Sequence, residues 1–502
     1  MSEAREAHAS HVMILGSGCA GSLLAWILAR QGMDVILIDR GRHPRFAIGE
    51  SSTPLADFLL EHIAERYGLH ELVPLARWGS WQKAYPQLRC GKKRGFSYYG
   101  HRPNEPFSDD QRHSRSLLVA ASVSDEVSDT HWMRSDVDQW LCQQAANAGA
   151  RNSESTQIET IVRTKAGWQI TGTTDGRPQR WTTHWLVDAT GNAGIVPQTL
   201  QIARRDDDLL TRTGSLFGHF TRVRPMTQWL NEAAIETASD PFDGDDAAQH
   251  HVTDDGWMWM LRFDCGITSV GFTRPTEIWK RDGDVSQHKP LAWKQLLARF
   301  PTLHDLMSES ELVGPCPPDS DCAADAQLGW IPRISRRWAA AAGDHWLALP
   351  STVGVIDPLH STGLAHALSG VARAAEILSQ PSRDGRRQEL LERYSHDVVD
   401  EVRWIDQLVS TCYAGLPDFE LFSAASTFYF IAAIECEREL SSTGSLKHGF
   451  LGARRSEWRE LVRSAARQLS TGVASRSPGD RARFIDQLRR QIEPWNPAGL
   501  LE

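Results

Sequence analysis

Three glycines and an aspartate near the start of the chain have the spacing of a nucleotide-binding turn. Gly16, Gly18 and Gly21 fit the pattern G-x-G-x-x-G, and Asp39 follows Gly21 by 18 residues. In such a turn the first glycine allows a tight bend, the second lets the backbone approach a pyrophosphate, and the third lets helix and strand pack closely. The acid can accept a hydrogen bond from a ribose hydroxyl, and an Asp rather than an Arg favours a ribose without a 2′-phosphate. These residues predict a dinucleotide site.

The elements that must position these residues can be read on either side of them. An apolar strand pattern covers Val12–Leu15, a helix pattern covers Ser22–Arg30, and a second apolar strand covers Val35–Ile38. This order predicts a Rossmann-type βαβ unit. The N-terminus of its helix offers free N–H groups and the positive end of the helix dipole to the phosphates.

Two later segments also end apolar strands with small or acidic residues. Trp185–Gly191 is a short apolar strand that leads into a loop. In Gly354–His366 an apolar approach meets an Asp-Pro pair, and a small-residue helix then continues to about Ser379. That helix is opened by Ser361, Thr362 and Gly363. A helix N-terminus of this kind suits a polar or anionic ligand.

The rest of the chain divides into a strand-rich middle and a helical end. Thr213–Val223 alternates, Glu154–Gly172 predicts strand and turn, and Trp257–Phe263 with Thr268–Thr273 predicts a hairpin. After residue 380 the apolar periodicity predicts helices at Arg386–Leu408, Phe419–Glu439, Glu457–Ser470 and Pro478–Gln491.

Composition limits the classes of function. The chain has 502 residues, is 41% hydrophobic and 23% charged, and therefore predicts a soluble globular protein. A net charge of −9 with no long basic run argues against nucleic acid as a partner. No secretory signal is visible, and the longest apolar-rich stretch, near Leu421–Ile434, is too short to span a bilayer. We therefore expect a cytoplasmic protein without a membrane span.

The cysteine and tryptophan counts say less about the class of function. The 8 Cys are scattered with no zinc-like spacing, which favours reduced thiols in a cytosol. Cys316 and Cys322 flank a Pro/Asp-rich loop and could pair, although free thiols are favoured. The 19 Trp against 7 Tyr suggest aromatic-lined pockets, but core filling explains the same count.

The order of the motifs resembles the FAD-binding monooxygenases of the glutathione-reductase-like group. The Gly-rich turn is followed by D-A-T-G at Asp188–Gly191 and by D-P-L-H-S-T-G at Asp357–Gly363. Within that group, Gly49–Pro54 is similar to the G-E-(S/A)-x-x-P segment of the flavin-dependent halogenases, which adjoins the flavin. His131–Asp138 is similar to the family segment whose arginine, here Arg134, approaches the flavin. The resemblance covers roughly residues 10–380.

This resemblance implies an α/β fold with a glutathione-reductase-type FAD-binding Rossmann domain over residues 8–380, in segments of about 8–80, 110–200 and 325–380. An inserted β-sheet substrate domain of about 81–109 and 205–324 and a C-terminal helical region, 381–502, complete the expected organisation. The residues expected to bind FAD are Gly16, Gly18, Gly21, Asp39, Glu50, Arg134, Asp188, Gly191, Asp357 and Gly363. Chloride or bromide is expected at Ser361, Thr362 and Gly363.

The resemblance also implies an oxidising lysine. Leu88–Gly100 is similar to the family's K-x-G-x-x-F/Y strand, which selects Lys93, with Lys83 as the alternative. In the family such an amine hydrogen-bonds or captures the halogen and passes it to an aromatic carbon. In an extended strand Lys92 and Arg94 lie on the opposite face, and their charge would help to lower the pKa of Lys93. Three consecutive cations also fit a solvated strand.

Two positions depart from the family pattern. In the W-x-W-x-I-P signature Trp257 and Trp259 are kept, but Leu261 and Arg262 replace Ile and Pro. His360 stands where tryptophan halogenases have a Glu; it could act as a catalytic base or be an ordinary loop histidine. The tryptophans expected in the substrate pocket are Trp78, Trp81, Trp257 and Trp259.

The implied activity is halogenation of an electron-rich aromatic acceptor through a flavin C4a-hydroperoxide and a lysine relay. No second G-x-G-x-x-G is visible, so a separate NAD(P)H flavin reductase is expected to deliver FADH2. The acceptor could be an aromatic small molecule, a carrier-tethered group or a peptide, and the chain could form a homodimer. The alternatives are a flavin-dependent aromatic hydroxylase on the same scaffold, a geranylgeranyl-reductase-like flavin reductase, and a non-catalytic flavoprotein.

Overall fold

A computed structural model of the chain describes residues 8–315, 326–381, 385–472 and 477–501. Cys316 and Cys322 lie outside these ranges. The other cysteines are free thiols, as predicted: Cys19, Cys90, Cys142, Cys265, Cys412 and Cys436.

The first sheet contains the predicted βαβ unit. Strand β1 pairs in parallel with β2 and with β10, and the helix α1 that joins β1 to β2 begins directly after Gly18. The sheet runs in the order β18-β19-β10-β1-β2-β7, and β8 and β9 extend β10 as an antiparallel meander. Its strands are β1 His8–Leu15, β2 Val35–Ile38, β7 Arg151–Ser153, β8 Thr156–Thr164, β9 Gly167–Thr174, β10 Arg177–Asp188, β18 Ala342–Gly343 and β19 Trp346–Ala348.

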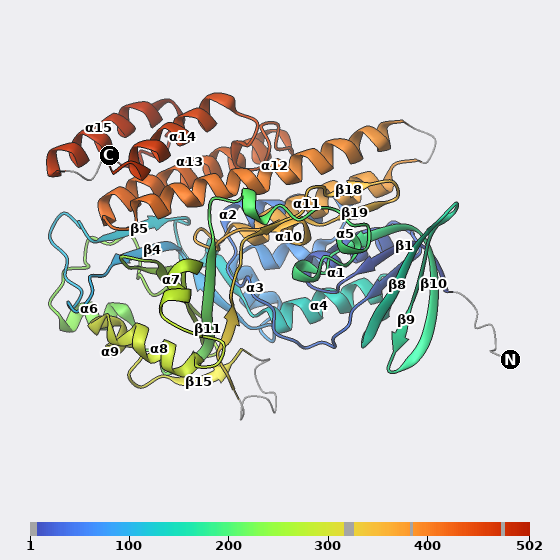
Figure 1. The fold of residues 1–502 in the computed structure, drawn as a ribbon, viewed down its shortest axis with the longest axis horizontal. Helices are drawn as coiled ribbons and strands as arrows, with labels where there is room; N and C mark the ends of the chain where they lie inside the picture. The colour runs from blue at the N-terminus through green and yellow to red at the C-terminus, as the bar shows by residue number, and fades with distance from the viewer. Residues whose placement is uncertain (1–7, 316–325, 382–384, 473–476, 502) are drawn as a thin grey trace.

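The second sheet is mostly antiparallel and lies beside the first (Figure 1). Its order is β15-β11-β14-β13-β12-β4-β5, with β16 also on β11, and β12 pairs with β4 in parallel. The predicted hairpin is present as β13 and β14. The strands are β4 Gly95–Gly100, β5 Ser116–Ala120, β11 Thr213–Thr221, β12 Ala248–Val252, β13 Trp257–Arg262, β14 Thr268–Pro275, β15 Glu311–Gly314 and β16 Gly329–Ile331. Two short ladders lie outside both sheets: β3 Cys90–Lys93 with β6 Asp129–Trp132, and β17 Arg336–Arg337 with β20 Gly354–Val355.

Helices cover both sheets, and the four C-terminal ones form a layer across the top of Figure 1. In the first part of the chain they are α1 Cys19–Arg30, α2 Pro54–Tyr67, α3 Trp78–Ala84, α4 Arg134–Asn147 and α5 Ile195–Thr199. The middle part adds α6 Met226–Glu232, α7 Thr276–Arg281, α8 Lys289–Ala298, α9 Pro301–Leu306, α10 Pro350–Val353 and α11 Thr362–Ser379. The C-terminal layer consists of α12 Arg386–Gly415, α13 Phe419–Thr443, α14 Ser456–Ser470 and α15 Pro478–Ile492.

The predicted segment boundaries at residues 81, 109 and 110 differ from the observed sheets. Strand β5 belongs to the second sheet, because it pairs with β4 and not with the Rossmann strands. Strand β3 belongs to neither sheet and pairs with β6 instead. Hydrogen bonds between strands distant in sequence decide both memberships, and local hydrophobic patterns do not carry that information.

Helix α13 is longer than the apolar stretch read from the sequence. By length and composition it could cross a membrane, so the expectation that this segment is too short was wrong. Its most apolar window is 72% buried inside the protein, against α12 and α2. Burial on most sides explains why it is apolar nearly all round.

A buried carboxylate ties the C-terminal layer to the second sheet. Asp406 on α12 is 2% exposed and accepts hydrogen bonds from the backbone N–H groups of Leu210 (2.6 Å) and Thr211 (2.8 Å), just before β11.

We predict that Asp406→Ala lowers the free energy of unfolding by about 1–3 kcal/mol, because a buried N–H group left without an acceptor costs about this much. Thermal denaturation followed by circular dichroism measures the effect, with Glu389→Ala on the exposed part of the same helix as the control. An Asp406→Ala variant with the melting temperature of the wild type would contradict this role of Asp406.

Candidate active site

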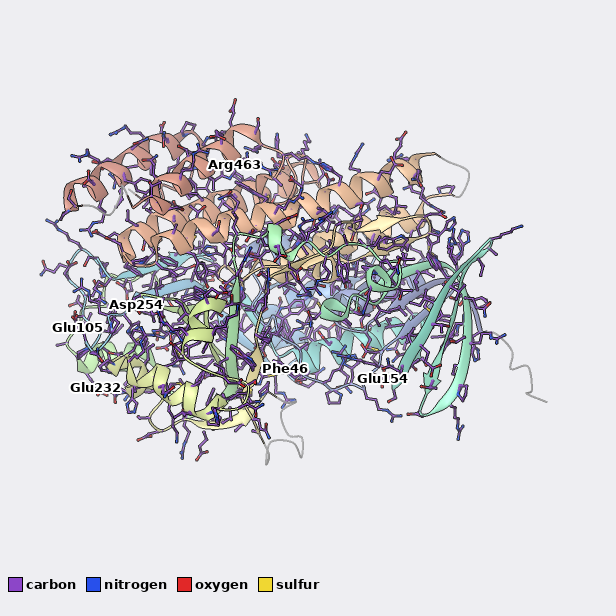
Figure 2. All side chains as sticks on the ribbon, in the orientation of Figure 1. Phe46, Glu105, Glu154, Glu232, Asp254 and Arg463 are labelled. Carbon is purple, nitrogen blue, oxygen red and sulfur yellow. The ribbon has the colours of Figure 1, made fainter. Side chains whose placement is uncertain are left out.

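A cavity of about 920 Å³ is lined by residues from both sheets and from α1, α11 and α12. We call it the cofactor cavity, because residues of every motif predicted to bind FAD or halide line it, together with two of the predicted tryptophans: Gly16, Gly18, Gly21, Asp39, Glu50, Arg134, Gly191, Trp257, Trp259, Asp357, Ser361, Thr362 and Gly363. Phe46 also lines it and stacks on Phe217 of β11, and Figure 2 shows Phe46 near the middle of the molecule, where the two halves meet.

The glycine turn leaves room for a phosphate-bearing ligand at one place only. A Cβ at Gly16 would lie 2.4 Å from the oxygen of Ala189, and one at Gly21 would lie 2.0 Å from the oxygen of Gly16. Gly16 also has φ +102°, which side chains rarely adopt. A Cβ at Gly18 would meet only Asp138 at 3.7 Å, so the backbone there faces open space. This cradle fits the pyrophosphate of a dinucleotide, as predicted.

Asp39 is held with its carboxylate at the edge of the cavity. It accepts from the Ser17 N–H (2.7 Å) and the Gly41 N–H (2.8 Å), and Arg45 pairs with it at 2.8 Å. Burial raises its pKa, but Arg45 and the N–H donors outweigh burial and hold the pKa below its ordinary value. The ionised group can therefore accept from ribose hydroxyls.

Glu50 and Arg134 fix the segment that closes the cavity. Glu50 is 5% exposed and contacts His219 Nε2 at 2.8 Å. Arg134 donates to the carbonyls of Ile48 (3.0 Å) and Gly49 (2.9 Å) and pairs with Asp138. Neither the histidine partner nor the two carbonyls was predicted, since they are recognised only once the strands and loops meet.

The Asp357–Gly363 loop is anchored to the second sheet and to α12. The Asp357 carboxylate accepts from Trp257 Nε1 (3.2 Å) and Tyr413 Oη (2.8 Å), and burial raises its pKa to about 6. Ser361 adopts φ +54°, and α11 begins at the next residue. The first N–H groups of a helix have no acceptor within the helix, so this turn presents donors to the cavity.

Lys93 lies outside the lining of the cofactor cavity, behind the segment Gly49–Pro54. It is 0% exposed, its Nζ donates to the carbonyl of Ser52, and it lies 4.1 Å from the centre of the Phe96 ring. Burial lowers the pKa of the amine to about 8, while Asp129 and Asp57 act to raise it. The predicted contribution of Lys92 and Arg94 was wrong: they point away and pair with Asp125 and, for Lys92, Asp246. Lys83, the alternative, is exposed and pairs with Glu126.

Next to Lys93 lies a group of buried rings, which we call the aromatic compartment. Its members are Phe96, Tyr98, His250, His360, Tyr429 and Phe430. His360 stacks on Tyr429 with ring centres 4.5 Å apart, and its nitrogens contact Tyr98 Oη (3.3 Å) and Cys412 Sγ (3.4 Å). Burial holds the pKa of His360 well below its ordinary value, so the ring is neutral. His250 also lines the cofactor cavity and so belongs to both spaces.

Three predicted site residues lie elsewhere. Trp81 is fully buried and donates to the Leu88 carbonyl, and Trp78 donates to Asp264; neither lines the cofactor cavity. Asp188 is also behind the lining, where it accepts from the N–H groups of Thr190 and Val196. Asp188 shapes the turn that presents Gly191, and the two tryptophans belong to α3.

Comparisons with known proteins agree with this geometry. A family model described as FAD dependent oxidoreductase matches residues 11–354. The chain belongs to this family. The predicted FAD-binding α/β fold and the resemblance to flavin-dependent halogenases are thereby confirmed, since relatives of that kind match nearly the full length of this FAD-dependent oxidoreductase.

Two curated relatives are halogenases. Monodechloroaminopyrrolnitrin halogenase PrnC of Pseudomonas fluorescens is 27% identical, over 96% of this chain and 85% of its own length. Tetracycline 7-halogenase of Kitasatospora aureofaciens is 25% identical, over 84% of this chain and 73% of its own. A solved structure of halogenase PltM in complex with phloroglucinol and FAD has TM-score 0.82 at 22% identity, covering 98% of each chain, and shows the same fold.

We predict that Gly18→Ala weakens FAD binding by about tenfold or more, because its methyl group would occupy the space where backbone and pyrophosphate meet. The residue has φ −65°, which alanine adopts freely, and the apoprotein has room for the methyl group. Flavin fluorescence titration measures the affinity, and apoprotein melting should match the wild type. Gly385→Ala, at another open position, is the control. Unchanged FAD affinity in Gly18→Ala would mean that the pyrophosphate lies elsewhere.

Proposed function

We propose that this FAD-dependent oxidoreductase is a halogenase that uses reduced FAD, dioxygen and a halide to halogenate an electron-rich aromatic small molecule. The observation that carries the proposal is the amine of Lys93, which is fully buried between the cavity-lining segment and the aromatic compartment. The halogenase relatives support it, including the one whose solved complex holds phloroglucinol.

In this proposal the residues of the cofactor cavity bind FAD and halide, and Lys93 and the aromatic compartment act on the acceptor. The glycine turn and the N-terminus of α1 hold the FAD pyrophosphate, and bound reduced FAD supplies the activation of dioxygen. The first N–H groups of α11, at Thr362 and Gly363, hold the halide at the cavity wall. Lys93 then directs the electrophilic halogen to the arene.

Lys93 suits this role because, among the residues that the structure describes, no carboxylate is hydrogen-bonded to its amine. The amine donates to a backbone carbonyl, and its other close neighbour is the face of the Phe96 ring. A buried amine with a lowered pKa, next to a cofactor cavity, is typical of a functional lysine. His360 already has partners at both nitrogens, so we assign halogen transfer to Lys93 and not to His360.

The aromatic compartment suits a small flat acceptor. Tyr98, His250 and Phe430 are at most 5% exposed and pack against one another through ring faces and edges. Rings arranged in this way favour stacking with an arene. We therefore propose a free aromatic small molecule, and a separate NAD(P)H flavin reductase as the source of reduced FAD.

The aromatic hydroxylase is the second candidate, favoured by His360 in place of the family's Glu and by Arg262 in place of Pro. In that reaction the arene is oxidised directly, and neither halide nor Lys93 is needed. The two reactions give different products from the same mixture, so one experiment separates them.

We predict that Lys93→Met reduces halogenation by about 100-fold or more, because the group that passes on the halogen is removed. Methionine keeps the volume of the buried side chain, and FAD binding should be unchanged. The assay supplies FAD, a flavin reductase with NADH, dioxygen, bromide and phloroglucinol, and detects products by mass spectrometry.

Lys83→Met, at an exposed lysine, is the control and should brominate as the wild type does. Bromination by Lys93→Met at the wild-type rate would refute the lysine assignment. A wild-type product that gains one oxygen and no bromine would identify the hydroxylase, and no oxygen-dependent product would favour the reductase or non-catalytic alternatives.

A further inference from the structure

Two buried carboxyl groups lie beside Lys93 and have no role in the function proposed above. Asp129 on β6 is paired directly opposite Lys93 on β3, so the two side chains share one face of the ladder. Asp57 is in the first turn of α2. They are 1% and 0% exposed, respectively. A carboxyl group so far from water needs a specific partner or a proton.

Ser52 connects these acids to the amine and to the cavity. Its hydroxyl donates to Asp57 Oδ1 at 2.8 Å, its carbonyl accepts from Lys93 Nζ, and its N–H donates to the Thr130 carbonyl at 3.0 Å. The preceding residue, Ser51, lines the cofactor cavity. One residue of the cavity-closing segment therefore holds both the acid and the amine in place.

The surroundings of the two acids favour a single proton between them. Among the described residues, Asp57 Oδ2 and Asp129 Oδ2 are buried without a hydrogen-bond donor, and each carboxyl group shifts the pKa of the other, so one proton shared between them would supply the missing donor. Burial, followed by the charge of Asp129, raises the pKa of Asp57 well above its ordinary value. Burial also raises the pKa of Asp129, and Lys93 opposes that rise. A neutral Asp57, an ionised Asp129 and a protonated Lys93 give the buried cluster no net charge.

We propose that Asp57 and Asp129 are a one-proton carboxyl pair that acts as positioning residues for Lys93, with ionised Asp129 holding the amine as an ammonium ion behind the cavity-closing segment. The role of the pair in catalysis rests on the halogenase function proposed above, whereas the shared proton does not.

The proton balance of halogen transfer explains why such a pair is useful. Hypohalous acid and the arene become the halogenated arene and water: the O–X bond breaks, the C–X bond forms, and the leaving hydroxide takes a proton from Lys93. The arene then loses its ring proton, and that proton restores the ammonium ion. The proton thus returns to the amine, ionised Asp129 again faces an ammonium ion, and no outside acid or base is consumed.

Other titratable groups face the cluster from each neighbouring element. Glu437 on α13 has a pKa raised to about 8, first by burial and then by Asp129. Arg77, before α3, acts on both acids and pairs with the more exposed Glu61. Burial, followed by the smaller effect of the Lys93 charge, lowers the pKa of His131 on β6 and of His250 on β12 and keeps both rings neutral. Tyr429 on α13 interacts with Asp129. None of these groups replaces Asp129 as the counter-ion of Lys93.

Melting of the apoprotein tests the shared proton without any activity. Asn at position 57 would still accept from the Ser52 hydroxyl, its N–H₂ group could donate to Asp129, and it would be neutral at every pH. Because Asp57 has a raised pKa in the folded state, its contribution to stability is complete below the unfolded value of about 3.9 and falls as pH rises toward the folded value. Asp57→Asn removes that loss.

We predict that Asp57→Asn melts with the wild type near about pH 3.5 and above it by about 2 °C or more near about pH 8. Asp129→Asn removes the counter-ion and should melt below the wild type at both pH values. Asp125→Asn is the matched control on the opposite face of β3, where the carboxylate pairs with Lys92 and Arg94. Destabilisation of Asp57→Asn at every pH would overturn the shared proton.

The pH profile of bromination tests the positioning role. If the ammonium ion is the active form, wild-type kcat falls as pH rises through the pKa of Lys93, and Asp129→Asn moves this alkaline limb to lower pH by about one unit or more. Asp125→Asn should leave the limb in place. An unshifted limb in Asp129→Asn would overturn the positioning role. A wild type that does not brominate would instead refute the proposed function, and the melting experiment would still decide the shared proton.

Discussion

The burial of one amine is the constraint on which the rest of the site depends. Lys93 lies at the end of a strand of four residues, has no exposed surface, and is covered by Phe96 and by the Gly49–Pro54 segment. An isolated charge in such a place is strongly disfavoured, so the fold must supply a counter-ion and hydrogen-bond acceptors. Asp129 across the ladder and the carbonyl of Ser52 meet that requirement. The short ladder of β3 and β6, which belongs to neither large sheet, places Asp129 directly opposite Lys93.

The same segment separates the cofactor cavity from Lys93 and the aromatic compartment. On one side Gly49, Glu50 and Ser51 line the cofactor cavity, and on the other side Ser52 holds Lys93. His250 and Trp257 form a shared wall, with ring centres 5.0 Å apart. The C-terminal layer completes the enclosure, because α12 provides Cys412 and Tyr413 and α13 provides Tyr429 and Phe430. In the proposed function this arrangement would keep the activated oxygen species apart from the oxidisable arene, with the amine between them.

Local patterns predicted much of this arrangement, and contacts between distant segments account for the remainder. The glycine turn, the β13–β14 hairpin and the four C-terminal helices follow from periodicities within a few residues, and the structure has them where they were expected. The contact between Glu50 and His219 joins positions 169 residues apart, and no local signal marks it. Asp57 and Asp129 look like ordinary polar residues in the sequence. Their burial is visible only once α2 and the β3–β6 ladder are packed together in the fold. The prediction that Trp78 and Trp81 line the pocket was wrong, because residues that are close to Lys93 in the sequence need not lie at the cavity in the fold.

The most direct test of this account is titration of Lys93 itself in the full-length apoprotein. Carbon-13 NMR of protein labelled at lysine Cε reports the protonation of each amine, and Lys93→Met identifies the resonance. The account predicts a titration midpoint near pH 8, because burial destabilises the ammonium ion. A midpoint at the ordinary lysine value of about 10.4 would show a solvated amine and would contradict the account.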